Sequence, residues 1–174
     1  MKPCTMSPAT SAPSPDRAAV RGLPPLYFVL PLAIALALQY LVLPVSFSLP
    51  AQGSLSGAAL RVAAGALLAL LGIAIFGATV AAHRRSGNDP HPTSPTTVLI
   101  TSGPYRFSRH PGYLGFALAQ AGIAVALGSV WVLGSVIVSL LLARYLAVLP
   151  EEAYLERKFG DQYRTYQDRV RRWV

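Results

Sequence analysis

The sequence predicts an all-α fold: a polytopic membrane protein with four transmembrane helices plus a C-terminal amphipathic helix. Composition is the first indication, because 53% of the 174 residues are hydrophobic and only 13% are charged, whereas soluble domains average about 25% charged residues. The second is that the apolar residues gather into four long runs. The third is that the polar segment 150–174 places its aromatic residues three and four apart, which is the spacing of one helical face.

The N-terminal segment 1–22 differs in composition from the rest of the chain. It is rich in Pro, Ser, Ala and Thr and has too little apolar surface to fold alone, so it is predicted to be a disordered tail. It also lacks the apolar stretch of a signal peptide. The single cysteine, Cys4, lies here and has no partner for an internal disulfide. Residues 23–174 are predicted to form one membrane domain.

Four spans follow from the apolar runs, since a bilayer core needs about 20 helical residues. They are separated by a turn-rich connection after the first span, a long cytoplasmic loop at 83–111, and a tight turn before the last span. The predicted spans cover about 24–43, 60–82, 112–127 and 130–149.

Individual residues within these runs predict how the helices pack. Gln39 is the one strongly polar residue of the first span, and we expect it to bond to a neighbouring helix. Gly65 and Gly72 are seven apart in the second span, so they share a face on which another helix can approach closely. Gly128 and Ser129 form a tight turn, which makes the third and fourth spans antiparallel neighbours.

The C-terminal segment 150–174 is predicted to be an amphipathic helix lying on an anionic membrane surface. Gly160 is expected to break it into two. Its apolar face holds Phe159, Tyr163, Tyr166, Val170 and Trp173, and its polar face holds Arg164, Asp168, Arg171 and Arg172. Just before it, Arg144 either reaches the membrane surface or faces a polar cavity.

The charge distribution bears on partners and orientation. The net charge is +8, but the cations flank apolar runs and form no single basic face, which argues against nucleic acid. Lys and Arg gather in the N-terminal tail, the loop 83–111 and the C-terminal segment. The positive-inside rule therefore places both termini and this loop in the cytoplasm.

The stretch Thr101–Gly115, TSGPYRFSRHPGYLG, is the candidate site. It combines cations with aromatic rings and enters the third span, while Glu151 and Glu152 leave the fourth. Because these spans are neighbours, the two clusters should meet at the cytoplasmic face. Two readings stay open from the residues alone: a pocket for a cationic ligand or an amine, or an ordinary juxtamembrane salt bridge.

No metal site is expected. The histidines His83, His91 and His110 are widely and irregularly spaced, with no cluster of Cys or acidic residues beside them.

Two spaced motifs carry a resemblance to a known family. They read G-P-Y-x(3)-R-H-P-x-Y-x-G and E-E-x(2)-L-x(3)-F-G-x(2)-Y-x(2)-Y, within residues 98–174. Together they resemble the isoprenylcysteine carboxyl methyltransferases, with the related phospholipid N-methyltransferases.

The resemblance implies a membrane enzyme that uses S-adenosylmethionine to methylate a lipophilic acceptor at the cytoplasmic face. Arg109 would place a carboxylate acceptor, and Glu152 would serve as base for an amine acceptor. The implied cofactor-binding residues are Gly103, Pro104 and Tyr105 as a lid, with Arg109, His110, Tyr113, Gly115, Glu151, Glu152 and Tyr163 lining the pocket.

Two alternatives remain. A membrane sterol-type reductase using NADPH has a similar Arg-His-Pro-x-Tyr-x-Gly turn, but usually follows that glycine with an acid, where this chain has Phe116. The other alternative is a non-enzymatic membrane protein that keeps the fold. The identity of the acceptor, the type of atom methylated and the oligomeric state are not predicted by the sequence.

Overall fold

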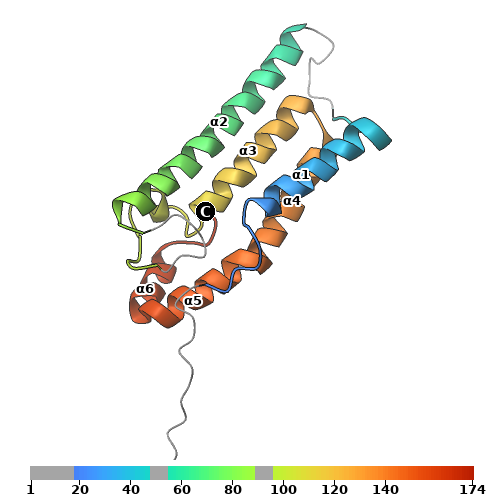
Figure 1. The fold of residues 1–174 in the computed structure, drawn as a ribbon. Helices are drawn as coiled ribbons and strands as arrows, with labels where there is room; N and C mark the ends of the chain where they lie inside the picture. Colours follow the sequence, from blue (N-terminus) through green and yellow to red (C-terminus); the bar gives the residue numbers. More distant parts are fainter. Residues whose placement is uncertain (1–17, 48–54, 89–95) are drawn as a thin grey trace, which may run out of the picture.

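The computed structural model describes residues 18–47, 55–88 and 96–174, and within these ranges it contains helices and no strand (Figure 1). The four apolar runs form the long helices, and the polar segments lie at one end of the bundle. The elements are α1 (Leu26–Ala37) continuing into the π-helical η1 (Leu38–Val42), α2 (Leu55–Arg85), the 3-10 helix η2 (Gly103–Arg106), α3 (Pro111–Leu127), α4 (Val130–Ala143) continuing through the π-helical η3 (Arg144–Val148) into α5 (Leu149–Phe159), and α6 (Asp161–Arg169).

Two helices in the described part of the chain are long and apolar enough to cross a membrane. They are Gly57–Arg85 and the continuous helix Val130–Phe159. Two further apolar helices, Leu26–Val42 and Pro111–Leu127, are shorter. The all-helical fold predicted by the sequence is confirmed.

Helices α2 and α3 pack with their backbones in close contact, as the small residues predict. A Cβ atom on Gly72 would lie 2.5 Å from the carbonyl oxygen of Gly115, and one on Gly65 would lie 2.6 Å from that of Gly122. Each helix therefore contributes two glycines seven residues apart to one seam. Close approach of this kind needs residues without a side chain at the crossing.

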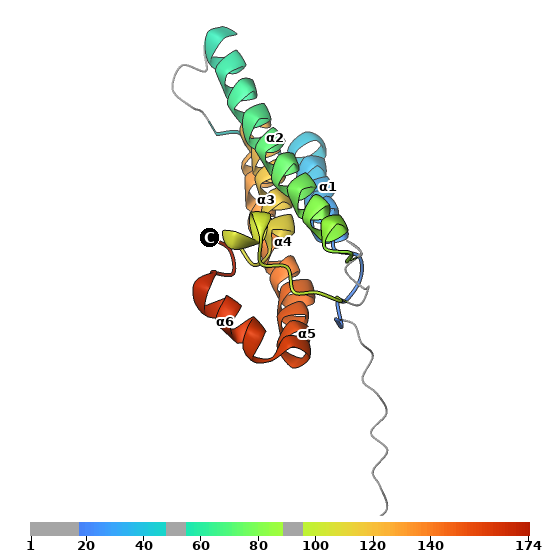
Figure 2. The ribbon, with the colours of Figure 1, turned by 90° about the vertical axis from the view of Figure 1, so that its left-hand side faces the viewer.

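Helix α1 packs on α4, and these two helices lie on the side of α3 that faces away from α2 (Figures 1 and 2). Its Phe28 is buried and stacks on Phe116 of α3, with ring centroids 5.2 Å apart. Phe116 also contacts Phe76 of α2, at 4.6 Å. The Phe116 ring of α3 thus lies between α1 and α2.

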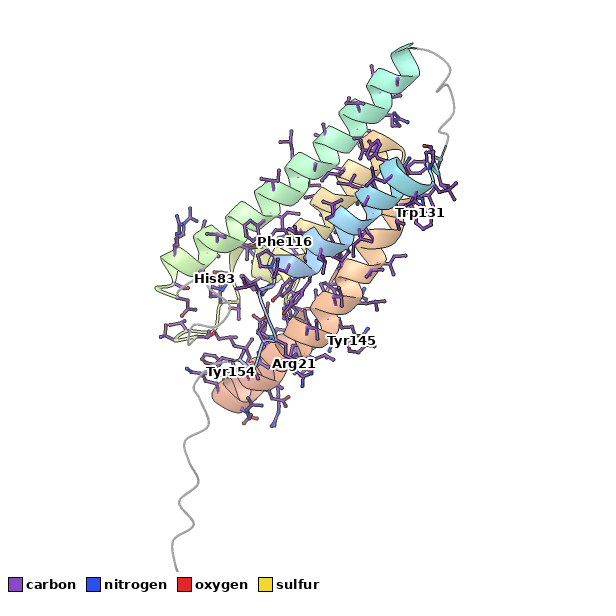
Figure 3. All side chains as sticks on the ribbon, turned by 45° about the vertical axis from the view of Figure 1, so that its right-hand side comes forward. Arg21, His83, Phe116, Trp131, Tyr145 and Tyr154 are labelled. Carbon is purple, nitrogen blue, oxygen red and sulfur yellow. The ribbon has the colours of Figure 1, made fainter. Side chains whose placement is uncertain are left out.

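The connections at the end of the bundle near Trp131 confirm two sequence predictions (Figure 3). Gly128 adopts the left-handed conformation with φ of 64°, and Ser129 begins α4 as its N-cap. The Ser129 hydroxyl donates a hydrogen bond of 2.8 Å to Gln39 Oε1. Gln39 therefore bonds to a neighbouring element, as expected.

Residues 18–22, which the composition assigned to the tail, lie against the helices. The Arg21 N–H donates to the carbonyl of Leu146 at 3.0 Å, the Tyr27 hydroxyl donates to the Arg21 carbonyl, and Ala18 is buried. Composition missed these contacts because they combine backbone hydrogen bonds with the packing of only a few apolar side chains, such as Val20. Residues 1–17, including Cys4, lie outside the described residues.

The C-terminal segment differs from the predicted single amphipathic face. Gly160, with φ of 52°, divides α5 from α6 as expected. Helix α6 ends at Arg169, however, and Val170 has extended backbone angles. Residues 170–174 then return to the start of α3, where the C-terminus lies in both views (Figures 1 and 2). Trp173 and Arg172 are therefore not on helical faces, and the half-buried Arg172 binds the buried Glu152.

Arg144 is exposed on the outside of the bundle. Its guanidinium lies over the ring of Tyr145, 5.8 Å from the centroid. Of the two positions left open by the sequence, the structure favours the surface.

Candidate active site

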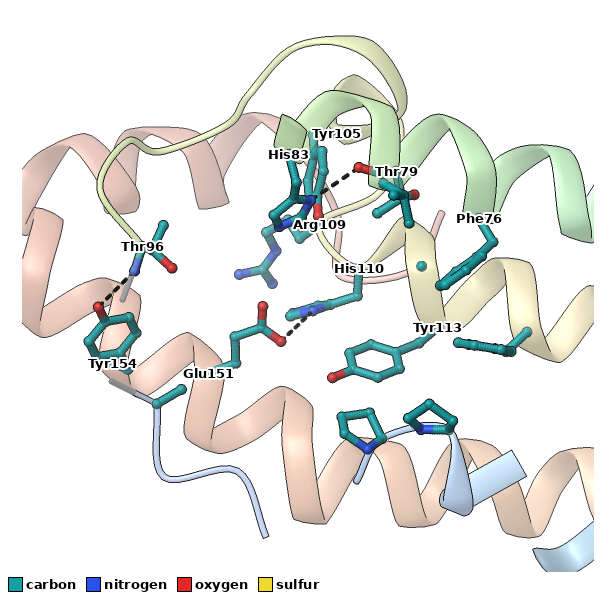
Figure 4. Close-up of a pocket in the computed structure, with 16 residues that line it drawn as sticks. Phe76, Thr79, His83, Thr96, Tyr105, Arg109, His110, Tyr113, Glu151 and Tyr154 are labelled. Carbon is teal, nitrogen blue, oxygen red and sulfur yellow. Dashed lines mark hydrogen bonds and ion pairs between the residues drawn. The ribbon is translucent and has the colours of Figure 1, made fainter. Parts of the chain in front are cut away.

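A cavity of about 390 Å³ lies where the polar segments meet the helix bundle (Figure 4). Its walls come from the start of α1, the last turns of α2, η2, the start of α3 and the start of α5. A second cavity of about 40 Å³ adjoins it, since the two share His83, Thr96, Tyr105, Arg109 and Glu151 among their lining residues. Small-molecule sites typically occupy about 300–1,000 Å³, so the larger cavity is of suitable size for a ligand.

Four ionisable side chains form a network at the wall of this cavity. Glu152 accepts two hydrogen bonds from Arg172, at 3.0 Å from Nε and 2.7 Å from Nη2. Its Oε1 also lies 3.3 Å from His110 Nε2 and 3.3 Å from Arg109 Nη1. The Glu152 side chain is only 8% exposed, and a buried charge is stable only when it is paired in this way.

The charge state of Glu152 follows from these contacts. Burial raises the pKa of its carboxyl group, but hydrogen bonds from His110 and Arg172 together with the charge of Arg109 outweigh burial and lower the pKa to about 2. Glu152 is therefore a carboxylate at neutral pH, and its oxygens are occupied by cationic partners.

His110 lies between the two glutamates. Its Nε2 faces Glu152, and its Nδ1 lies 3.6 Å from Glu151 Oε2. The imidazole ring is nearly fully buried, whereas the Glu151 side chain is 34% exposed. Both ring nitrogens are thus directed at carboxylates, and Glu151 is the carboxylate that faces the cavity.

The local sequence explains why Arg109 and His110 point inward. Pro111 is the first residue of α3, where its missing N–H is not needed. The preceding turn is held by Ser108, whose hydroxyl accepts from the His110 N–H at 3.2 Å and donates to the Arg172 carbonyl at 3.1 Å. The Arg109 N–H donates to the Arg171 carbonyl at 3.1 Å.

Some buried polar atoms at the site make no hydrogen bond within the described part of the chain. They include Arg109 Nε and Nη1 and the Tyr163 hydroxyl. Leaving such groups without a partner is unfavourable. Arg109 Nη1 is still ion-paired with Glu152 at 3.3 Å. Arg109 lines both cavities and Tyr163 the smaller one, so Arg109 Nε and the Tyr163 hydroxyl are the groups left for a bound ligand.

Tyrosines complete the polar part of the wall. The Tyr166 hydroxyl donates to the Tyr105 carbonyl at 2.7 Å and so attaches α6 to η2. Burial raises the pKa of Tyr105, with the Glu151 charge adding to the effect. Burial likewise raises the pKa of Tyr163 to about 12. Both side chains are neutral hydroxyl groups at physiological pH.

The structure gathers most of the residues implied by the resemblance. Those that line the larger cavity are Tyr105, Arg109, His110, Tyr113 and Glu151, and Tyr163 lines the smaller one. Glu152 lies behind the wall, where it holds His110 and Arg109.

Three implied residues lie elsewhere. Gly103 and Pro104 are in η2 but outside the lining of both cavities. Gly115 faces α2, where an added Cβ would lie 2.7 Å from the Gly72 carbonyl oxygen. Its lack of a side chain therefore serves helix packing.

Sequence reasoning missed two residues. Arg172 was placed on a solvent-facing helix, and no local signal shows that the helix ends before it. His83 lines both cavities, but from the sequence it was weighed only as a metal ligand. It follows Phe76, Thr79 and Val80 at helical spacing, and all four line the larger cavity, so that periodicity was an available signal.

Comparison with known families bears on this site. A family model described as phospholipid methyltransferase matches residues 60–162, more than half of the chain. The chain belongs to the phospholipid methyltransferase family. The match includes the Arg109–His110 pair and the two glutamates, and it ends before residues 170–174.

Individual proteins also match part of the chain. The chain is 36% identical over 75 residues to a protein-S-isoprenylcysteine O-methyltransferase of Schizosaccharomyces pombe, covering 42% of this chain and 31% of that protein. It is 39% identical over 74 residues to a probable protein-S-isoprenylcysteine O-methyltransferase of Oryza sativa subsp. indica, covering 41% and 38%. It is also 39% identical over 62 residues to an uncharacterized protein of Haemophilus influenzae, covering 36% of this chain and 98% of that protein.

The chain spans about a third of the length of the S. pombe and rice methyltransferases that it matches. No solved structure matches it.

Proposed function

We propose that this phospholipid methyltransferase family member catalyses S-adenosylmethionine-dependent methyl transfer to a lipophilic acceptor. The observation that carries the proposal is the larger cavity, in which Arg109, His110 and Glu151 face an apolar wall that includes Phe76, Val80 and Phe116. Family membership supports the reaction type, and the names of the S. pombe and rice relatives support it further.

The polar part of the cavity suits the amino-acid end of this cofactor. Arg109 pairs with Glu152 through Nη1 and keeps a buried Nε without a hydrogen-bond partner in the described residues, so its guanidinium can also take a carboxylate of the ligand. Glu151 is partly exposed to the cavity and would accept hydrogen bonds from an ammonium group. The bound cofactor supplies a methyl group activated by a positively charged sulfur.

Methyl transfer of this type depends mainly on alignment of the reacting groups. In this chain the alignment is provided by Glu152, which holds Arg109 and His110 from behind while Arg172 holds Glu152. We therefore assign Glu152 a positioning role in place of the base role implied by the resemblance. Arg109 keeps the role of contacting a ligand.

The apolar part of the cavity suits a hydrocarbon acceptor. At the end of the cavity nearest the helix bundle, Phe116 lies between Phe28 and Phe76. Pro24 and Pro25, which precede α1, also line the cavity. These residues lie on the predicted membrane spans. A lipid or isoprenoid-like chain would reach the cavity from the bilayer.

We further propose that the protein crosses the membrane four times, with both termini and the cavity on the cytoplasmic side. The shorter helices Leu26–Val42 and Pro111–Leu127 are each 17 residues long, which is at the lower end of the range of about 17–25 residues for a transmembrane helix. The cationic residues near Arg84, Arg85 and Arg109 gather at one end of the bundle, as the positive-inside rule predicts for the cytoplasmic side.

The test is calorimetric titration of the detergent-solubilised protein with S-adenosylmethionine and, separately, with NADPH. We expect S-adenosylmethionine to bind, with affinity reduced at least tenfold by Arg109→Ala and by Glu151→Gln. Arg164→Ala is the matched control, because Arg164 is 61% exposed and pairs with Glu156 and Asp161 on the surface.

Three other outcomes would contradict the proposal. Binding of NADPH alone would indicate a reductase. Binding of neither ligand by the folded protein would favour a non-enzymatic role. Equal losses in the Arg109 and Arg164 variants would show that this cavity is not the binding site.

A further inference from the structure

His83 lines the larger cavity and has one ring nitrogen without a hydrogen bond in the described part of the chain. It lies on the last turns of α2, across from the charged network on α3 and α5 (Figure 4). Its Nδ1 lies 3.1 Å from the Thr79 carbonyl oxygen. In the described part of the chain, its Nε2 makes no hydrogen bond.

The contact with Thr79 fixes which nitrogen of neutral His83 carries the proton. A carbonyl oxygen can only accept a hydrogen bond, so Nδ1 must be the donor. The neutral ring then has its lone pair on Nε2. The ring orientation is set by a second contact, the edge-on packing of Tyr105 at 5.7 Å between centroids, and Tyr105 is itself held by the Tyr166 hydroxyl.

The other candidate bases at the cavity are engaged. His110 directs both ring nitrogens at carboxylates, 3.3 Å and 3.6 Å away. Glu152 is behind the wall and has its oxygens occupied by Arg172, His110 and Arg109. Glu151 has one oxygen beside His110, and in the proposed function it receives an ammonium group.

We propose that His83 Nε2 is the proton acceptor for the methyl acceptor, and that the nucleophilic atom of this acceptor carries a proton, as an amine nitrogen does. The inference rests on the proposed methyl transfer and deepens it, because it decides between the amine and carboxylate acceptors left open above. A carboxylate is already a nucleophile and would need no such residue.

The proton and electron balance of the step is complete. One N–H bond of the substrate ammonium breaks, its electron pair stays on nitrogen, and the proton goes to His83 Nε2. The nitrogen then forms a bond to the methyl carbon as the carbon–sulfur bond breaks, and that electron pair stays on sulfur. The proton then passes from His83 to water.

The first readout is independent of activity. The chain has three histidines, His83, His91 and His110, so NMR spectra of protein labelled with 15N-histidine, compared with those of His83→Gln, assign the His83 ring. We expect the neutral ring to be protonated on Nδ1 and unprotonated on Nε2. A ring protonated on Nε2 instead would overturn the proposal.

The second readout compares acceptors. Wild-type protein, His83→Gln and His83→Asn are incubated with labelled S-adenosylmethionine and either phosphatidylethanolamine vesicles or an S-prenylated cysteine with a free carboxylate. Gln carries its amide at the place of Nε2, and Asn carries its amide near Nδ1, where it can keep the bond to Thr79. General-base catalysis contributes about 10²–10⁴-fold, so we expect both variants to lose amine methylation by about a hundredfold or more.

Cofactor binding separates this inference from the proposed function. We expect both variants to bind S-adenosylmethionine within about threefold of wild type, since loss of a proton acceptor leaves cofactor contacts intact. If wild type methylates the amine and either variant is as active, the His83 inference fails while the proposed function stands. The inference fails in the same way if wild type methylates only the carboxylate. If wild type binds no S-adenosylmethionine, both fail.

Discussion

The salt bridge between Arg172 and Glu152 predicts a large difference between two adjacent arginines. Arg172 donates two hydrogen bonds to Glu152, at 3.0 Å and 2.7 Å. Arg171 contributes only its carbonyl, which accepts from the Arg109 N–H, and its side chain is exposed. Arg172→Ala therefore removes a partner from a buried carboxylate, while Arg171→Ala leaves every described contact of the site in place.

The expected magnitude lies between two limits. Removing one partner of a fully buried ion pair costs about 3–5 kcal/mol, and removing one from an exposed pair costs about 0–1 kcal/mol. The Arg172 side chain is 30% exposed and that of Glu152 is 8% exposed, and Glu152 keeps His110 and Arg109. We expect Arg172→Ala to lower the free energy of unfolding by about 2 kcal/mol, which for a chain of this size lowers Tm by about 4–8 °C.

The assay is thermal unfolding of the purified protein in one detergent, with S-adenosylmethionine titration beside it. Arg171→Ala is expected to change stability by no more than about 0.5 kcal/mol, as exposed substitutions usually do, and to keep wild-type cofactor affinity. Arg172→Ala is expected to weaken that affinity, because Glu152 positions Arg109 and His110. Equal effects of the two substitutions would refute the reasoning.

Three further predictions test packing, pH dependence and the remote end of the bundle. Gly72→Ala places a Cβ 2.5 Å from backbone atoms of α3, whereas Gly77→Ala meets nothing within 4 Å. In thermal unfolding we expect Gly72→Ala to lower the free energy of unfolding by about 1–3 kcal/mol or more, and Gly77→Ala to leave it unchanged or raise it by up to about 1 kcal/mol. Similar Tm values for the two variants would contradict the close packing of these glycines between α2 and α3. The pKa of Glu152 is lowered to about 2 in the folded protein from an unfolded value of about 4.3, so its contribution to stability is present above about pH 4.3 and is lost as the pH falls toward 2. The free energy of unfolding of Glu152→Gln should therefore fall less steeply over this pH range than that of the wild type. The same pH dependence in both proteins would exclude this contribution of Glu152. A double-mutant cycle of Gln39→Leu and Ser129→Ala should give a coupling energy of about 0.5–1.5 kcal/mol in thermal unfolding, and strict additivity would show that their hydrogen bond contributes nothing.

Features set by local spacing were predictable from the sequence. The turn at Gly128 and Ser129 required a tight connection between two apolar runs, and Gly65 and Gly72 share a face because seven residues make nearly two helical turns. Since the turn makes α3 and α4 neighbours, the meeting of His110 with the paired glutamates followed from the same observation. These predictions needed no knowledge of distant contacts.

Features set by distant contacts were not predictable in this way. Adjacent residues on a helix point about 100° apart, so only one of Glu151 and Glu152 can face the cavity, and the sequence does not say which. The aromatic spacing continued to Trp173, but the helix ends at Arg169, because the last residues bind the turn before α3. The rings of His110 and Trp173, 6.2 Å apart, are separated by 63 positions in the chain.

The hydrogen bonds at the Ser129 end join the segment that follows α1 to the turn between α3 and α4. There the Ser129 hydroxyl donates to Gln39, the Trp131 ring N–H donates to the Leu43 carbonyl, and the Phe47 N–H donates to the Gly128 carbonyl. The opposite end surrounds the cavity, whose walls come from separate helices. The contacts that close the bundle at the Ser129 end are therefore separate from those that hold the polar residues of the cavity, so substitutions at one end should leave the contacts of the other end in place.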